Sequence, residues 1–171
     1  NFIFQDSSRF NVSDGKTLHV GVEMQADLRL PSGVYGGFAG TYAKQTYDFD
    51  ARTPGGEVIR SGNEIDTAPR TLASARIGYE YRRGLAEFEW VNVGDYYLDA
   101  ANTAEYSGHN LLNLRGVWRA TPQWSVTVRL NNLADKLYAE RADFVSFPSP
   151  GYRYFPGRER EMYVEVAYGA P

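Results

Sequence analysis

TLHVGVEMQADLRL, residues Thr17–Leu30, is the stretch that decides the fold. Every second residue from Leu18 to Leu30 is apolar, and the residues between them are polar or glycine. A period of two places successive side chains on opposite faces of a β-strand. Strands of globular proteins are mostly about five or six residues long, whereas a tilted strand that crosses a bilayer needs about 9–11. This amphipathic strand is therefore long enough to cross a membrane.

The same alternation returns along the chain and predicts about eight strands. We expect them around Phe2–Gln5, Thr17–Leu30, Val34–Tyr47, Thr71–Arg82, Leu85–Tyr97, Leu111–Ala120, Trp124–Leu133 and Glu159–Tyr168. One face of these strands is apolar, with residues such as Ile77, Phe88, Leu114, Val128 and Val164. The other face carries charges such as Arg76, Glu87, Arg115, Arg129 and Glu165. A charged face of this kind must meet water or another polar body.

The connections between these strands alternate between short and long. The short ones are Pro31-Ser32-Gly33, Arg83-Gly84 and Thr121-Pro122-Gln123, and the long ones are the segments 50–70, 98–110 and 132–158. Bacterial outer-membrane barrels have short periplasmic turns and long extracellular loops. The pattern therefore predicts an up-and-down antiparallel barrel whose short turns face the periplasm. We expect the segment 132–158 to be a structureless outer loop.

Composition narrows the function classes. The 171 residues are 43% hydrophobic, and no apolar run reaches the roughly 18 residues of a transmembrane helix, so membrane insertion requires a closed barrel. The absence of cysteine excludes disulfides, thiolate metal sites and thiol catalysis. A net charge of −3 gives no electrostatic footprint for nucleic acid. The aromatic content of 15%, with 13 Tyr, suits the interfacial aromatic girdles of a membrane barrel.

Four stretches resemble the C-terminal part of the β-barrel of a TonB-dependent outer-membrane receptor. They are His19-Val20-Gly21-Val22-Glu23 after Asp14-Gly15-Lys16, Leu111-Leu112-Asn113-Leu114-Arg115, Asn131-Asn132-Leu133-Ala134-Asp135-Lys136-Leu137-Tyr138, and Pro156-Gly157-Arg158 before the last strand. Their order and spacing carry the resemblance, which covers essentially the whole chain. This family imports siderophores, haem, cobalamin or glycans across the outer membrane of Gram-negative bacteria.

The resemblance implies that residues 1–171 are a fragment of a barrel of about 22 strands with a plugged lumen. The plug domain is absent from this sequence, and the remaining strands and the plug of the same receptor are expected partners. The TonB complex would act only through the missing plug. The other expected partners are outer-membrane lipid and a small ligand such as an iron chelate, and the cargo that we expect is a ferric siderophore. No catalysis on the cargo, cofactor, metal site or nucleic acid is implied.

The resemblance also directs attention to aromatic and basic residues of the outer loops as ligand contacts. Arginine suits an anionic chelate, and aromatic rings suit catecholates or sugars. An alternative is that these side chains form the upper girdle or pack the loops. The candidates are Tyr96, Tyr97, Tyr106, His109, Phe144, Tyr152, Tyr154 and Arg158.

Three other interpretations stay open from the sequence. A small outer-membrane enzyme, a protease or phospholipase, could use Asp95, Asp99 and His109 at the barrel rim. A soluble β-sandwich would also explain apolar alternation. Eight strands could close on themselves without transport activity, which would require charges inside the barrel to pair, for example Arg76 with Glu87 or Arg115 with Glu89.

Overall fold

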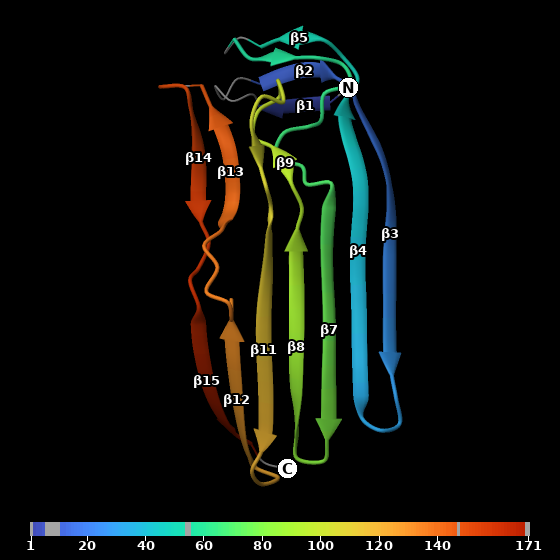
Figure 1. Cartoon of the computed structure of the whole chain (residues 1–171), viewed down its shortest axis with the longest axis vertical. Helices are drawn as coiled ribbons and strands as arrows, with labels where there is room; N and C mark the ends of the chain where they lie inside the picture. The colour runs from blue at the N-terminus through green and yellow to red at the C-terminus, as the bar shows by residue number, and fades with distance from the viewer. Residues whose placement is uncertain (1, 6–10, 54–55, 147, 170–171) are drawn as a thin grey trace.

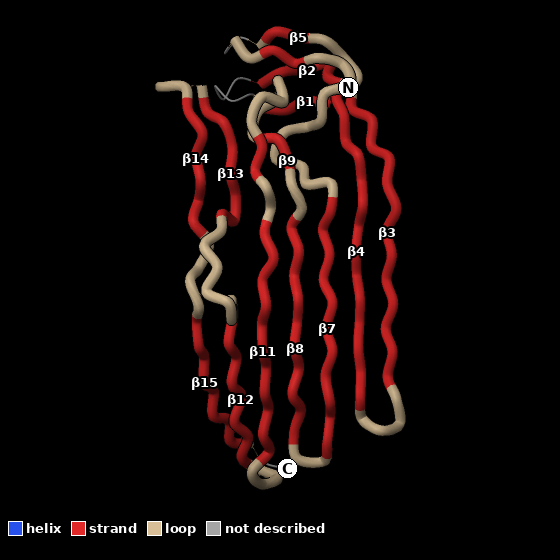
Figure 2. Tube along the Cα trace, viewed as in Figure 1, coloured by secondary structure: helices blue, strands red, loops and turns tan. Residues whose placement is uncertain are grey.

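Seven long strands form one antiparallel sheet in the order β15-β12-β11-β8-β7-β4-β3 (Figure 1). The computed structural model describes residues 2–5, 11–53, 56–146 and 148–169. The bounds are β3 Thr17–Arg29, β4 Val34–Tyr47, β7 Thr71–Tyr81, β8 Gly84–Val93, β11 His109–Arg119, β12 Trp124–Asn131 and β15 Glu161–Tyr168. The elements of this part of the chain are strands joined by turns and loops (Figure 2).

The register of the sheet aligns the predicted apolar residues on one face. One row of paired residues runs Ile77, Phe88, Leu114, Leu130 and Met162 across five strands. These side chains point away from the charged residues, and many are open to their surroundings. Val22 is 62% exposed, Ile77 61% and Val164 58%. We call this surface the apolar face and the opposite one the charged face. The predicted division of the two faces is confirmed.

The buried hydrophobic core lies at the end of the sheet that carries the long loops. Two small clusters are found among the described residues, one around Tyr96, Leu98, Ala139 and Ala142 and the other around Tyr47, Ile59 and Ala100. The body of the sheet exposes both of its faces and has no such core. The hydrophobic surface of the strands is therefore available to a lipid environment, whereas the loops hold themselves together as a protein interior does.

The short connections are tight turns, as predicted. In the turn between β3 and β4, the amide of Gly33 donates to the carbonyl of Leu30 at 3.0 Å, and the amide of Leu30 donates to Val34 at 2.8 Å. Gly33 has a φ of 94°, which a residue with a Cβ rarely adopts. All three short turns lie at one end of the sheet, and the long loops lie at the other (Figure 1).

The sheet is open, which corrects two sequence-based alternatives. Its edge strands are β3 and β15, and β1 (Phe2–Gln5) pairs with β2 (Asn11–Gly15) in a separate hairpin. The predicted first strand thus exists but adds no strand to the main sheet. Seven strands that remain open do not form a self-closed eight-stranded barrel, and a single sheet with two exposed faces is not a sandwich. The antiparallel fold is confirmed. Its two edge strands, β3 and β15, leave backbone groups with which further strands could pair.

The long connections are more structured than expected. The segment 132–158 contains a hairpin of β13 (Ala139–Val145) and β14 (Gly151–Pro156), so its prediction as a structureless loop was wrong. The segment 50–70 holds a short pairing of β5 (Ala51–Arg52) with β6 (Val58–Ile59). In the segment 98–110, β10 (Glu105–Tyr106) pairs with β9 (Tyr96–Tyr97), which comes just before this segment. The predicted strand Leu85–Tyr97 is interrupted after Val93, because Gly94 and Asp95 leave the sheet.

Candidate functional site

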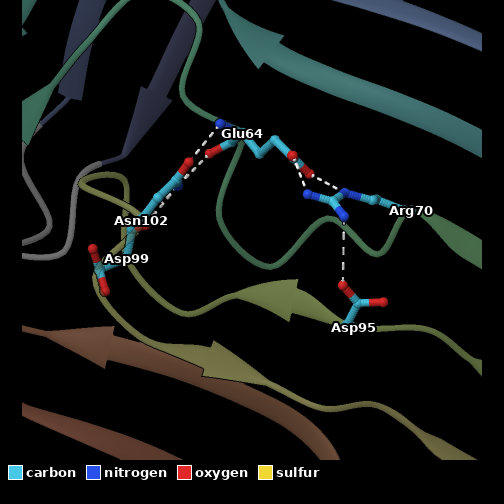
Figure 3. A network of polar contacts seen from close by, with 5 residues as sticks. All are labelled: Glu64, Arg70, Asp95, Asp99 and Asn102. Atoms are coloured by element: carbon cyan, nitrogen blue, oxygen red, sulfur yellow. Dashed lines mark hydrogen bonds and ion pairs between the residues drawn. The ribbon is translucent and has the colours of Figure 1, made fainter.

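The three long loops pack on one another at one end of the sheet, and we call residues 48–70, 94–108 and 132–160 the loop assembly. Asn102 joins the first two loops. Its Oδ1 accepts the amide of Glu64 at 2.7 Å, and its Nδ2 donates to the carbonyl of Glu64 at 2.8 Å (Figure 3). Asn102 has a φ of 57°, which asparagine tolerates better than most residues. The Asn102 side chain thus pairs with the backbone of Glu64 as a neighbouring strand would, although the two residues are 38 positions apart in the sequence.

A second tie within the loop assembly is ionic. The guanidinium of Arg70 makes a bidentate contact with the Glu64 carboxylate and lies 3.7 Å from Asp95 (Figure 3). The hydrogen bond to Glu64 is the main reason why the pKa of Arg70 is raised above its ordinary value. A fork-to-fork contact fixes orientation as well as charge. Glu64 therefore holds Arg70 through its carboxylate and Asn102 through its backbone.

The third contact within the loop assembly involves the buried side chain of Tyr47. The hydroxyl of Tyr47, at the end of β4, donates to Oδ1 of Asp66 at 2.5 Å. Burial raises the pKa of Asp66 above its ordinary value, although the hydrogen bond from Tyr47 acts in the opposite direction. Glu57 and Asp99 add negative charge that raises the pKa further. Ionisation of Asp66 therefore destabilises the folded loop assembly.

Asp66→Asn should stabilise the loop assembly at neutral pH and remove part of its pH dependence. A raised folded-state pKa gives a stabilising contribution that is fully present below the unfolded value of 3.8 and is lost as the pH rises through the folded value. We expect the variant to be cleaved more slowly than wild type in the segment 56–70 at neutral pH and equally fast near the unfolded value. The measurement is the cleavage rate by an acid-tolerant protease across this range. A constant difference between the two proteins would contradict it.

The third loop joins the assembly through an apolar cluster. Tyr96 is 7% exposed and packs with Leu98, Ala139 and Ala142. Its hydroxyl accepts the amide of Ala142 at 2.9 Å, and the amide of Phe144 donates to the carbonyl of Leu98 at 2.9 Å. The hairpin β13–β14 is therefore anchored on the loop that precedes β11. Leu98 belongs to one buried cluster and Ala100 to the other, so this short stretch connects all three loops.

Several predicted ligand contacts turn out to be internal contacts of this assembly. His109 is 7% exposed. Its Nδ1 lies 3.0 Å from the hydroxyl of Tyr106, and its ring lies 4.5 Å from the ring of Tyr138. The hydroxyl of Tyr106 also contacts the backbone of Ala139. Together with Tyr96, these side chains form an aromatic seam that secures the loops.

The remaining candidates lie nearer the surface. Tyr97 and Phe144 are half-buried, whereas Tyr152 is 46% exposed and Tyr154 56%. Arg158 is exposed and contacts Glu161 and the hydroxyl of Tyr163, each at 3.3 Å. Of the eight predicted residues, Tyr96, Tyr106 and His109 thus belong to the inner seam, and Tyr97 is half-buried on the second loop. The other four lie on the last loop: Phe144, Tyr152, Tyr154 and Arg158.

The residues that an enzyme would need are engaged elsewhere. The Asp99 carboxylate accepts hydrogen bonds from the amides of Thr103 and Ala104, and Asp95 pairs with Arg70. His109 contacts two tyrosines instead of either carboxylate. Within the described ranges, no group of three or more histidine, aspartate and glutamate side chains is placed to hold a metal ion.

The charged face of the sheet carries a network that crosses strands. Nη2 of Arg76, on β7, donates to Asp27 on β3 at 2.9 Å, although β4 lies between them. Gly37 on β4 leaves the necessary space, since a Cβ there would come within 2.7 Å of Asp27 Oδ1 and 2.8 Å of Arg76 Nε. We expected Arg76 to pair with Glu87 in a closed eight-stranded barrel. That expectation was wrong, because Arg76 reaches across Gly37 to Asp27.

A second contact on the charged face also passes over a glycine of the intervening strand. The ring of Tyr35, on β4, lies over Gly78 of β7, where a Cβ would collide with it. Its hydroxyl reaches β8 and donates to Glu87 at 2.8 Å. Glu89 accepts from Nδ2 of Asn113 at 2.9 Å instead of pairing with Arg115. Arg29 pairs with Glu80 at 2.6 Å and lies over the Tyr35 ring. On the β3–β8 part of the charged face, Arg29 and Arg76 are therefore ion-paired, and the carboxylates of Glu87 and Glu89 accept hydrogen bonds from neutral side chains.

Asn132 is a structural residue of the loop assembly whose contacts sequence reasoning missed. It is 3% exposed and has a φ of 50°. Its side chain accepts the amide of Lys136 at 2.9 Å and donates to the carbonyls of Lys136 and Arg158 at 2.9 and 3.1 Å. Its own amide donates to the side chain of Asn113 at 3.0 Å. These hydrogen bonds of Asn132 join the end of β12 to the start of β15. In the sequence, only the two adjacent asparagines pointed to such a role.

Comparison with protein families gives one match. The sequence model of the family described as TonB dependent receptor-like, beta-barrel matches residues 1–133. No curated protein was found to be similar in sequence.

Solved receptor structures share the fold. The ferric yersiniabactin uptake receptor FyuA from Yersinia pestis is 19% identical with a TM-score of 0.75, covering 95% of this chain and 25% of that one. The siderophore receptor PiuA from Acinetobacter baumannii is 16% identical with a TM-score of 0.76, covering 97% and 24%. The unliganded ferric citrate transporter FecA is 18% identical with a TM-score of 0.77, covering 98% and 27%. The chain thus spans about a quarter of the length of these proteins, and the likeness shows the fold alone.

Proposed function

The chain belongs to the TonB-dependent receptor-like β-barrel family, and from this premise we propose that it forms the closing segment of the barrel of a larger outer-membrane receptor. Further strands of that receptor would pair with the open edges of β3 and β15. Its plug would fill the lumen against the charged face, and the TonB complex would act through the plug. The apolar face meets outer-membrane lipid in this arrangement.

The observation that carries this proposal is the loop assembly. Its loops are tied by Asn102, Glu64 and Arg70 and by two buried clusters, so they hold a fixed shape at one end of the sheet. A fixed outer surface binds a ligand without a large cost of ordering loops. The strands are joined at the opposite end by short turns. We therefore place ligand capture at the loop end and passage of the cargo along the charged face.

The proposed cargo is a ferric siderophore. Its support is the set of structural neighbours described as siderophore or ferric-chelate receptors, together with the exposed aromatic and basic residues of the last loop. Tyr152 and Tyr154 offer ring faces, and Arg158 offers a cation for an anionic chelate. Uptake in this proposal involves no chemistry on the cargo.

Tyr152→Ala combined with Tyr154→Ala should weaken ferric-siderophore binding by about 5- to 150-fold, since each of the two aromatic contacts contributes about 0.5–1.5 kcal/mol. The measurement is quenching of intrinsic fluorescence by a panel of ferric siderophores, using the receptor that carries this chain. Tyr81→Ala is the matched control, because Tyr81 is 43% exposed at the opposite end of the sheet.

Uptake of radioactive iron by iron-starved cells tests the cargo itself. Cells that lack the receptor should lose uptake of one ferric siderophore and regain it with the wild-type gene. If every siderophore in the panel enters these cells at the normal rate, the proposed cargo is wrong. Hydrolysis of a peptide or phospholipid by the purified receptor would instead favour the enzyme alternative.

A further inference from the structure

The buried imidazole of His109 supports the base of the β13–β14 hairpin, by which we mean Tyr138, Ala139 and Gly157. His109 is the first residue of β11, and its ring packs among residues of the loop assembly. The ring of Tyr138 lies 4.5 Å from the His109 ring. Gly157 packs against Tyr138, where a Cβ would collide with the tyrosine ring, and its amide donates to the carbonyl of Tyr138 at 2.9 Å. Both ends of the hairpin are therefore tied to one imidazole.

A tyrosine hydroxyl connects the same imidazole to the first residue of β13. The hydroxyl of Tyr106 lies 3.0 Å from Nδ1 of His109, accepts the amide of Ala139 at 3.1 Å and lies 3.3 Å from the Ala139 carbonyl. A tyrosine hydroxyl has one proton and two lone pairs. It can therefore donate to a neutral His109, or accept from a protonated one and turn its own proton to the carbonyl. These hydrogen bonds survive protonation of the ring, so the effect of protonation must come from its charge.

The described surroundings of His109 offer no anion to an imidazolium ion. The ring is 7% exposed, and no carboxylate in the described ranges forms an ion pair with it. The groups that face it are Tyr106 from β10, Tyr138 and the cation of Lys136 from the third loop, and Val93, its partner in register on β8. Burial, followed by the positive charge of Lys136, lowers the pKa of His109 below its ordinary value. The closed loop assembly thus favours the neutral ring.

We propose that protonation of His109 in mildly acidic solution releases the base of the hairpin from the loop assembly. A buried cation without an anionic partner is costly, and this cost disappears once the ring reaches water. In the described part of the chain, β13 and β14 form their own sheet, so the base can separate without breaking the seven-stranded sheet. Tyr152 and Tyr154 lie on β14. An effect on cargo capture would rest on the proposed function, whereas the release itself does not.

The pH range follows from linkage between protonation and opening. A histidine whose folded-state pKa lies below its unfolded value of 6.5 leaves the closed state intact above that value and weakens it as the pH falls toward the folded value. One proton can raise the open fraction by up to about tenfold between about pH 7.5 and about pH 5.5. Asp66 has the opposite sign, since its protonation stabilises the closed state. The first loop should therefore stay closed under conditions that open the hairpin.

Hydrogen exchange of the intact receptor at these two pH values tests the release, with rates corrected for the intrinsic pH dependence of exchange. We expect peptides that cover Ala139 and Gly157 to lose up to about tenfold in protection in acid, while the segment 56–70 keeps its protection. His109→Gln cannot take up a proton in this range and should show equal protection at both pH values. His19→Gln is the matched control, because His19 is exposed on β3 and contacts the side chain of Thr17. It should respond to acid as wild type does.

Each outcome decides the inference. Equal acid responses of wild type and the His109 variant overturn it, as does a wild type that keeps its protection in acid. Loosening of the segment 56–70 together with the hairpin would mean general acid unfolding and would also overturn it. If the His109 variant is loose at both pH values, Lys136→Gln decides. Removing this charge should reduce the acid response, and an unchanged response would contradict the inference.

The test also separates the inference from the proposed cargo. A hairpin that opens in acid, in a receptor that binds no ferric siderophore, would leave the inference standing and remove the cargo. A hairpin that stays closed in acid, in a receptor that takes up a ferric siderophore, would overturn the inference alone.

Discussion

Val22→Arg is expected to destabilise the folded receptor in lipid by about 2–4 kcal/mol, the cost of an arginine facing lipid near the middle of a bilayer. Val22 lies near the middle of β3 on the apolar face and is 62% exposed. In a soluble protein, an arginine at so exposed a position would cost little. The size of the effect therefore reports directly on whether this face meets lipid.

The adjacent residue supplies the matched control. Glu23 is exposed on the opposite face of the same strand, so Glu23→Arg should change stability much less than Val22→Arg does. Both variants can be measured by urea unfolding in lipid vesicles and by the heat-dependent shift in gel mobility that folded outer-membrane barrels show. Equal effects of the two substitutions would refute the assignment of the faces.

Asn132→Ala is expected to cost about 2–4 kcal/mol, because it removes three side-chain hydrogen bonds of about 1 kcal/mol each and leaves alanine in a left-handed conformation. The bonds go to the backbone of Lys136 and Arg158. Their loss removes the Asn132 side chain as a partner of these backbone groups. We expect the link between β12 and β15 to loosen while the β3–β8 part of the sheet keeps its structure.

Asn131→Ala serves as the control, since Asn131 precedes Asn132 in the chain and lies in the regular pairing of β12 with Glu161 of β15. Hydrogen exchange of the intact receptor can localise the effect. Faster exchange should appear in residues 133–138 and 157–161 of the Asn132 variant alone. Uniformly faster exchange across the whole sheet would instead indicate global destabilisation and a different role for this residue.

The sheet could be predicted from the sequence because its information is local. Apolar residues at every second position identify the strands, and Gly33 and Pro122 mark tight turns. These signals gave the two faces correctly from β3 to β15. The hairpin β13–β14 was missed because the adjacent polar residues Glu140 and Arg141 and the adjacent apolar residues Phe144 and Val145 break the alternation along β13. Its strands are held by pairing and by Leu98 instead of by a lipid-facing pattern.

The candidate site depends on contacts that no local pattern encodes. Asn102 reads as an ordinary turn residue, yet it clamps Glu64 from 38 positions away. His109 and Tyr96 read as surface aromatics in a loop, whereas tertiary packing buries them. Arg76 has an acidic cross-strand partner in Glu89, but its hydrogen bond goes to Asp27 across a glycine. Burial and pairing across intervening strands decide these roles, and both arise only when the chain is folded.

The glycine gaps of the charged face have a consequence for how the strands find their alignment. A strand that slips by two residues keeps its apolar side chains toward lipid, so hydrophobicity cannot distinguish the slipped sheet from the correct one. The contacts over Gly37 and Gly78 can make this distinction, because Asp27 meets Arg76 and Tyr35 meets Glu87 only when three successive strands are correctly staggered. A slip of β7 by two residues would put Arg76 or Glu80 where Gly78 leaves its gap. The contacts over these two glycines therefore favour the correct register of the strands over one that is slipped by two residues.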